Sequence, residues 1–212
     1  MIDPHTLIDR LPAATHMASA PGRVNLLGEH VDYNGGVVLP IAINRRVWLA
    51  ARPLPDDQVI LHALDLQEEV TFSLADLQAK TTLQGKPMPA WALYPAGVAW
   101  SLCQQGLLVT GVEAIFSSDV PIGAGLSSSA ALELAFAVLW QLLAGWQLDR
   151  MALAQVCQAA ENSYVGVNCG LMDQFASAHG QAGHALYFDT RSLDWRPLPL
   201  PAEVSVVVAD SG

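Results

Sequence analysis

The chain has 212 residues, of which 52% are hydrophobic and 14% are charged, and its formal net charge at pH 7 is -10. This composition is typical of a packed globular protein and excludes an intrinsically disordered chain. The acidic balance argues against a nucleic-acid partner, because such binders carry a basic patch. A phosphate ligand is still compatible with it, since backbone dipoles and a metal ion can supply a local positive field.

The cysteines and the apolar segments bear on location. The three cysteines, an odd number, fit no zinc-ligand spacing and are expected to be buried free thiols in a reducing cytosol, which predicts a cytoplasmic protein. They are Cys103, Cys157 and Cys169. The N-terminus has no apolar signal core. The most apolar segment, residues 130–144, is interrupted by Glu133 and Gln141 and is too short to span a membrane, so we expect no membrane partner.

The first part of the chain is expected to be mainly β-structure after a short surface helix over residues 1–14. A turn is expected at residues 19–22, and a strand over residues 37–51 with a bend near Asn44. Two shorter strands are expected at residues 59–64 and 69–72. Residues 76–89 are polar and contain Gly85 and two prolines, which indicates a connecting loop.

A polar, glycine-rich stretch lies between the predicted turn and the first strand, at residues 22–36. It brings Arg23, Glu29, His30 and Asp32 close together, and buried polar side chains cost free energy unless they are paired. The stretch is therefore either a solvated loop with local ion pairs or a binding site. As a site, Arg23 would pair with a carboxylate or a phosphate, and the other three side chains would suit sugar hydroxyls.

A glycine–serine loop with the sequence PIGAGLSSSAALE occupies residues 121–133, between a predicted strand at 111–117 and a helix that continues to about Ala144. Glycines allow close backbone approach to a ligand, and serines favour helix starts. Free N–H groups and the positive end of the helix dipole then form an anion site. No lysine follows as in a Walker A loop. The alternative is an ordinary loop with a serine cap.

Three more helices are predicted, at residues 91–105, 150–164 and 169–179. Pro95 should kink the first helix or shift its start, and Asp149 should cap the second. Glu161 lies near the unfavourable C-terminal dipole of the second helix, so it is either held by a cation or simply exposed. Asp173 lies in the first turn of the third helix, as a general base or as a surface carboxylate. Further strands are expected at residues 185–189 and 204–209.

Three separated motifs together resemble the GHMP kinase superfamily and, within it, the galactokinase family. They are GRVNLLGEHVDY at 22–33, PIGAGLSSSAALE at 121–133 and CGLMDQFAS at 169–177. The resemblance extends from residue 20 to residue 212 and implies an α+β fold. The implied fold is the ribosomal protein S5 domain 2-like N-terminal lobe, a mixed β-sheet with packed helices, over residues 1–200. Residues 201–212 would begin a C-terminal domain that the sequence lacks.

The resemblance also implies a reaction and a role for each matching residue. The reaction is phosphorylation of α-D-galactose at its anomeric hydroxyl by ATP, with Asp173 as base and Arg23 orienting it and steadying charge on the phosphoryl group. The positions that match the galactose pocket are Glu29, His30, Asp32 and Gly170. The positions that match the loop around the ATP phosphates are Gly123, Ala124, Gly125, Leu126, Ser127, Ser128 and Ser129. Ser129 and Glu161 match the usual Mg²⁺ ligands.

The departure from the family lies at the end of the sequence, because galactokinases are normally much longer. A full-length protein is expected to be a monomer, and the 212-residue chain alone is expected to have little or no activity. Three alternatives stay open: another GHMP sugar kinase, such as one for N-acetylgalactosamine; a non-catalytic regulator that binds galactose and ATP; and a remnant that is unfolded or self-associates.

Overall fold

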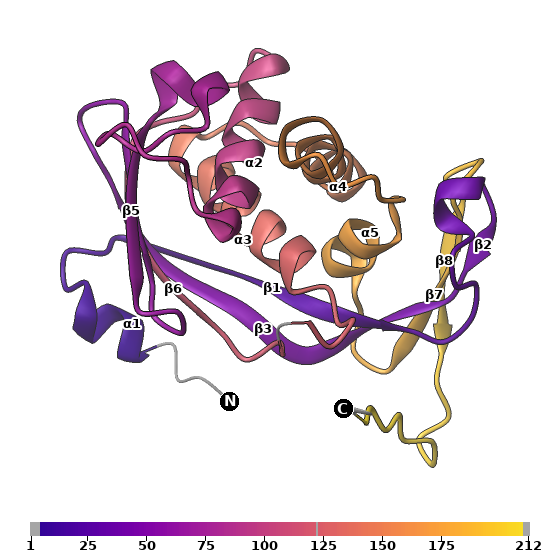
Figure 1. Cartoon of the computed structure of the whole chain (residues 1–212). Coiled ribbons are helices and arrows are strands. Elements are labelled where there is room, and N and C mark those ends of the chain that lie inside the picture. Colours follow the sequence, from indigo (N-terminus) through magenta and orange to yellow (C-terminus); the bar gives the residue numbers. More distant parts are fainter. Residues whose placement is uncertain (1–4, 122, 210–212) are drawn as a thin grey trace.

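The computed structural model describes residues 5–121 and 123–209 and has a layered α+β architecture (Figure 1). A five-stranded sheet has the order β1-β3-β6-β4-β5, and its neighbours are antiparallel except for the parallel pair β4 and β6. Its strands are β1 His16–Asn25, β3 Pro40–Pro53, β4 Gln58–Ala63, β5 Glu68–Ser73 and β6 Val112–Ser118. A three-stranded antiparallel sheet of β2 Val37–Val38, β7 His184–Asp189 and β8 Trp195–Pro199 lies beside it. This confirms the expected mixed sheet.

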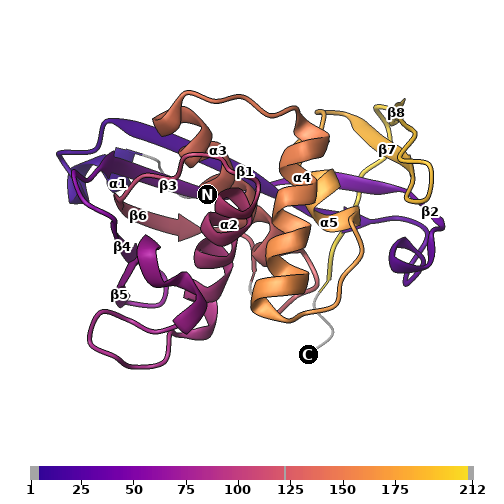
Figure 2. The same ribbon diagram turned by 90° about the horizontal axis from the view of Figure 1, so that it is seen from above.

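Four α-helices cover one face of the larger sheet, and α1 His5–Arg10 packs on the other face (Figures 1 and 2). The four are α2 Leu93–Gln104, α3 Ser128–Ala144, α4 Arg150–Ala159 and α5 Met172–His179. Short 3-10 turns occur at Asp32–Asn34, Leu74–Ala79 and Ala90–Ala92, and a π-helical turn at Ala160–Val165 continues α4. Among the described residues, no helix is both long and apolar enough to cross a membrane.

The main core lies between the sheet and α3, which is apolar on nearly all sides because strands and helices surround it. Phe136 of α3 meets Phe116 of β6 edge to face at 5.9 Å and Trp140 one turn further at 5.6 Å. Both Phe136 and Trp140 are completely buried. This packing fixes α3, and with it the loop that enters its N-terminus.

A second core holds α5 against the smaller sheet. The ring of Phe175 stacks on Phe188 of β7 at 3.8 Å and on His179 at 4.4 Å. Trp195 of β8 meets the same two α5 rings from the side. The orientation of α5 is therefore set by apolar residues on the side away from Asp173.

Two sequence predictions about strands need correction. The turn expected at residues 19–22 is part of β1, where Pro21 and Gly22 are accommodated because the pairing with β3 shifts register between Pro21 and Arg23. The single strand with an irregularity near Asn44 is confirmed, because β3 is one strand and Asn44 lies opposite this shift. Residues 204–209 form no strand and are exposed, whereas β8 went unpredicted because prolines interrupt it.

Several helix predictions are confirmed. Pro95 lies in the first turn of α2, so it shifts the start of that helix to Leu93 and does not kink it. Asp149 caps α4 by accepting a hydrogen bond from the Ala152 N–H at 2.8 Å. The cysteines are free, as expected, but only Cys157 is buried: Cys169 is partly buried and Cys103 is exposed.

Candidate active site

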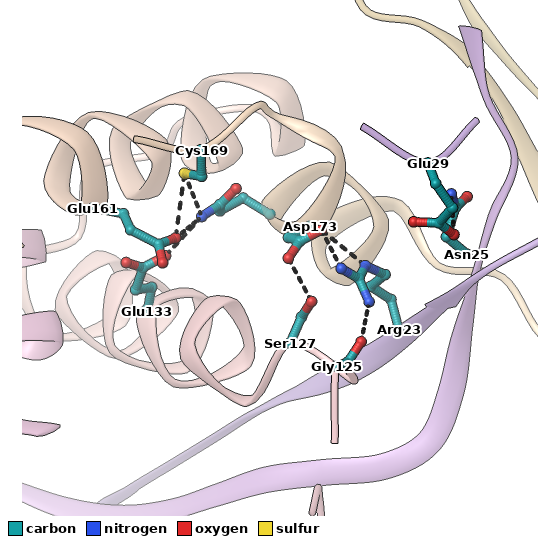
Figure 3. A network of polar contacts seen from close by, with 10 residues as sticks. Arg23, Asn25, Glu29, Gly125, Ser127, Glu133, Glu161, Cys169 and Asp173 are labelled. Carbon is teal, nitrogen blue, oxygen red and sulfur yellow. Dashed lines mark hydrogen bonds and ion pairs between the residues drawn. The ribbon is translucent and has the colours of Figure 1, made fainter. Parts of the chain in front are cut away.

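The three motif stretches meet where β1, the loop before α3 and the first turn of α5 come together (Figure 3). Arg23 of β1 donates from Nε to Asp173 Oδ1 at 2.8 Å, and its Nη2 lies 2.7 Å from the same oxygen. Their side chains are 13% and 28% exposed, so this ion pair is shielded from solvent but open on one side. Hydrogen bonds between charged groups are shorter and stronger than neutral ones.

The second oxygen of Asp173 is bound by the loop. The Ser127 hydroxyl donates to Asp173 Oδ2 at 2.5 Å. Ser127 has left-handed backbone angles (φ 57°, ψ 52°) and makes no side-chain capping bond to α3. The alternative of an ordinary loop with a serine cap therefore does not hold at Ser127, whose hydroxyl binds the candidate base.

Gly22 allows the loop to lie directly against β1. A Cβ at Gly22 would come within 2.6 Å of the Leu126 carbonyl oxygen, so any side chain there would displace the loop. The Arg23 N–H donates to that carbonyl at 3.0 Å, and Arg23 Nη1 donates to the Gly125 carbonyl at 2.6 Å. The first motif therefore binds the second through backbone carbonyls.

The loop residues that the sequence assigned to phosphate binding lie at the N-terminus of α3. Gly123, Ala124 and Gly125 are exposed, Leu126 is buried, and Ser128 and Ser129 begin the helix. Seventeen residues of helix follow, so the N–H groups of the first turn are free to bind an anion. The remaining residue of the loop, Ile122, lies outside the described residues.

A cavity of about 520 Å³ opens beside Asp173, and it contains all four residues expected to contact a sugar. Its lining is Arg23, Glu29, His30, Asp32, Tyr33, Asn168, Cys169, Gly170, Met172 and Asp173. Glu29 accepts a hydrogen bond from Asn25 Nδ2 at 2.9 Å, which orients its carboxylate. Acceptors and donors that converge in this way are suited to a polyhydroxylated ligand.

Asp32 is fixed by close packing against Gly170. A Cβ at Gly170 would lie 2.1 Å from Asp32 Oδ2 and 2.8 Å from the Asp32 backbone carbon, so this position excludes a side chain. Burial raises the pKa of the Asp32 carboxyl, and the nearby charge of Asp173 raises this pKa further. Backbone N–H groups, including that of Met172, oppose the shift. Asp32 therefore lies next to the candidate base and within the same cavity.

Ser129 and Glu161, the expected metal ligands, are neighbours. Glu161 lies in the π-helical turn and is only 6% exposed, and it is close enough to Ser129 for that hydroxyl to lower its carboxyl pKa. The alternative of a solvated surface glutamate is therefore wrong. Burial raises the pKa of the Glu161 carboxyl, while hydrogen bonds from Cys169, Gln174 and Ser129 oppose the shift.

The donor set fits Mg²⁺. A hydroxyl and a carboxylate lie together, and Mg²⁺ prefers a few hard oxygen ligands completed by substrate phosphates and water. The described part of the chain holds no group of three or more His, Cys, Asp or Glu residues that could bind a metal without such help.

Comparisons with known proteins identify the family. The galactokinase galactose-binding signature matches residues 9–53, and the GHMP kinase N-terminal domain matches residues 94–181. The galactokinase of Chloroflexus aurantiacus is 47% identical over 198 residues, 93% of this chain and 49% of the relative. That of Streptomyces coelicolor is 46% identical over 187 residues, 85% of this chain and 46% of the relative. The chain belongs to the galactokinase family.

Solved structures agree with this membership. The crystal structure of Lactococcus lactis galactokinase complexed with galactose has a TM-score of 0.83 and 29% identity, over 98% of this chain and 56% of that one. Mevalonate kinase from Methanococcus jannaschii, at 18% identity and a TM-score of 0.68 over 86% of this chain and 55% of that one, shares the fold. This galactokinase-family chain spans about half the length of the curated relatives it matches.

Sequence reasoning about this galactokinase-family chain missed a second cavity. It measures about 210 Å³, is lined mainly by apolar side chains and lies next to Ser128 and Ser129. Trp91 of the 3-10 turn before α2 and Tyr94 in the first turn of α2 form part of its wall together with Phe116. A tryptophan and a tyrosine three residues apart are the local signal that could have indicated an aromatic-lined pocket.

Proposed function

We propose that the protein is a galactokinase, which transfers the γ-phosphoryl group of ATP to the anomeric hydroxyl of α-D-galactose, giving galactose 1-phosphate and ADP. One observation carries the proposal: the carboxylate of Asp173 lies in the cavity lined by Glu29, His30 and Asp32, and it is bonded to the loop that enters α3. The candidate base therefore touches both the expected sugar site and the expected phosphate site.

The acceptor side of the proposed reaction relies on two residues. Asp173 accepts the proton of the anomeric hydroxyl as the oxygen attacks, which is the role of a general base. Arg23 binds Asp173 Oδ1 and fixes its orientation, and its positive charge lies beside the loop carbonyl of Gly125. Phosphoryl transfer depends mainly on such positioning and on neutralisation of charge.

The loop before α3 and the apolar cavity are proposed to bind ATP, the phosphoryl donor. N–H groups at the start of α3 bind the phosphates of ATP, and the cavity lined by Trp91 and Tyr94 receives the apolar face of the adenine base. Ser129 and Glu161 hold Mg²⁺. When bound, Mg²⁺ neutralises charge on the phosphates.

The relatives support galactose as the acceptor. The Lactococcus lactis protein, which covers nearly the whole of this chain, was solved with galactose bound. The named relatives at 47% and 46% identity are galactokinases. We further propose that residues 1–200 form the N-terminal domain of the kinase, and that the enzyme works in the cytoplasm, in keeping with its free thiols.

Calorimetric titration with a panel of sugars tests the proposal. The 212-residue chain, shown to be folded by circular dichroism, is titrated with galactose, N-acetylgalactosamine and glucose. Transfer from ATP is measured on the chain joined to the C-terminal half of the Chloroflexus aurantiacus relative. Galactose-specific binding with formation of galactose 1-phosphate supports the proposal. Transfer to N-acetylgalactosamine in preference to galactose would contradict it.

A further inference from the structure

A buried polar cluster lies behind the candidate site, and of its members only Glu161 has a role in the motifs (Figure 3). Its centre is Gln174 of α5, which is completely buried and follows Asp173 directly. Its amide nitrogen donates to Glu161 Oε2 at 2.6 Å and to Glu133 Oε2 at 3.1 Å. One side chain therefore joins α5, α3 and the π-helical turn.

This cluster is costly for the folded protein. Glu133 is completely buried, and burial together with the charge of Glu161 raises the pKa of its carboxyl well above the usual range. In the described part of the chain, neither carboxylate has an ion pair with an arginine, lysine or histidine. Burial of polar groups without full pairing is unfavourable for the folded state.

Two oxygen atoms of the cluster are unpaired. Glu133 Oε1 and Gln174 Oε1 are buried and have no hydrogen-bond partner. A cluster kept for stability alone would satisfy such atoms or replace them with apolar groups. The incomplete pairing indicates that the cluster serves Glu161, the one member of the three that is not completely buried and the one whose carboxyl pKa the Ser129 hydroxyl lowers.

The identity of residue 174 is explained by the two carboxylates. A primary amide offers two N–H donors on one atom, so glutamine can bind both acidic neighbours at once. A glutamate would place a third carboxyl beside them, and a methionine of similar shape would offer no donor. Glu133 binds the second N–H and so keeps the amide nitrogen turned toward Glu161.

We propose that Gln174 is the positioning residue for Glu161: anchored on Glu133, it holds the Glu161 carboxylate beside Ser129, so that the two oxygen ligands of the divalent cation are arranged before the cation binds. This inference rests on the proposed function. It adds that one turn of α5 presents the base through Asp173 and orients the metal ligand through Gln174. A ligand oriented in advance loses less conformational freedom when the metal binds.

The test measures metal binding directly, with Mn²⁺ as the probe and a non-hydrolysable ATP analogue present, by electron paramagnetic resonance on the 212-residue chain. Gln174→Met should weaken Mn²⁺ binding by roughly 10–100-fold, the usual effect of removing a residue that orients a metal ligand. Galactose affinity should stay unchanged, because Gln174 does not line the sugar cavity. A merely structural role would lower both affinities together.

Two further variants make the result decisive. Gln158→Met is the matched control, because Gln158 donates to the Cys169 carbonyl at 3.3 Å and not to Glu161, and it should bind Mn²⁺ as the wild type does. Gln174→Met leaves the buried Glu133 carboxylate without its hydrogen-bond donor. If that variant does not fold, the double variant Glu133→Met, Gln174→Met removes this carboxylate as well. It should fold and show the same loss.

The outcomes separate the two proposals. Undiminished Mn²⁺ affinity in a folded variant without Gln174, or an equal loss in Gln158→Met, would overturn the positioning role and leave the proposed function intact. Failure of the wild-type chain to bind Mn²⁺ with the nucleotide analogue would contradict the metal site itself, and the positioning role with it.

Discussion

Asp173 and Gln174 are consecutive residues of α5, and their side chains lie in opposite surroundings. Asp173 is partly exposed and each of its carboxylate oxygens has a donor, whereas Gln174 is fully buried between two carboxylates and keeps an unpaired oxygen. On the open side, the Asp173 carboxylate can be reached by solvent and substrate, and both of its oxygens have hydrogen-bond donors. On the buried side, Gln174 leaves one oxygen without a partner while its amide nitrogen binds Glu161, the expected metal ligand. Chemistry and positioning are therefore carried by neighbouring residues with different physical requirements.

The strongest way to disrupt the open side is Asp173→Asn. The substitution keeps the shape but removes the proton acceptor, so we expect kcat to fall by roughly 10²–10⁴-fold. The assay is phosphoryl transfer by the chain joined to the C-terminal half of a relative, with calorimetry for the sugar. Galactose binding should be largely retained. Wild-type turnover in this variant would show that Asp173 is not the base.

A smaller effect is expected from Gly170→Ala, which alters the sugar cavity without touching the base. The new Cβ would force Asp32 to move, and a misplacement of about 1 Å can reduce rates by roughly 10²-fold. We expect weaker galactose binding, measured by calorimetry. Gly166→Ala is the control, because nothing lies within 4 Å of that position, although its φ of 92° makes the substitution strained. Equal galactose affinity in wild type and Gly170→Ala would contradict the packing argument.

Ser127 tests how much the loop contributes to the open side. Ser127→Ala and Ser127→Gly both remove the hydroxyl from Asp173 Oδ2, and we expect each to lower kcat by about tenfold, a value in the range of one charge-assisted hydrogen bond. Thermal unfolding should show the glycine variant as the more stable, since residue 127 has left-handed backbone angles. Full activity in the glycine variant would mean that backbone geometry, and not the hydroxyl, matters.

The smallest effect concerns His179, on the side of α5 away from Asp173. Burial lowers the pKa of His179, and the charge of Arg150 lowers it further. The Phe175 carbonyl and the charge of Asp149 oppose this shift. A lowered folded-state pKa means that the unfolded chain binds more protons as the pH falls below about 6.5, so stability decreases there. Urea unfolding at about pH 7.5 and pH 5.5 should show that the change from pH 7.5 to pH 5.5 is less unfavourable for the stability of His179→Gln than for that of the wild type. Identical pH dependence would contradict this. The raised carboxyl pKa values of the buried cluster act in the opposite direction and cancel in the difference.

The resemblance to a family, more than any single residue, predicted the open side of the site. Taken alone, Arg23, Glu29, His30, Asp32 and Asp173 fitted a solvated loop and a surface carboxylate equally well. The structure places them around one cavity, and their roles stay predictions. Most strands and helices followed from apolar patterns. β1 did not, because proline and glycine signal a turn, whereas here a register shift accommodates them.

The buried side was not predictable in the same way. Glu133 interrupts the most apolar segment of the sequence, but neither it nor Gln174 carries a local signal that the two side chains meet. Their burial results from α3 lying between the sheet and three helices, a tertiary arrangement that a single sequence does not express. The same holds for Trp91, whose position at a cavity wall depends on how the 3-10 turn before α2 packs against Phe116 of β6.

The backbone hydrogen bond from the Arg23 N–H to the Leu126 carbonyl gives the protein a built-in probe. This amide can exchange with deuterium only when the loop separates from β1, so its exchange rate measures how often the loop opens. Because the bond uses no loop side chain, substitutions at Ala124 or Ser128 leave the probe in place. Slower exchange on addition of nucleotide would therefore show, from a single amide, that the loop closes around its ligand.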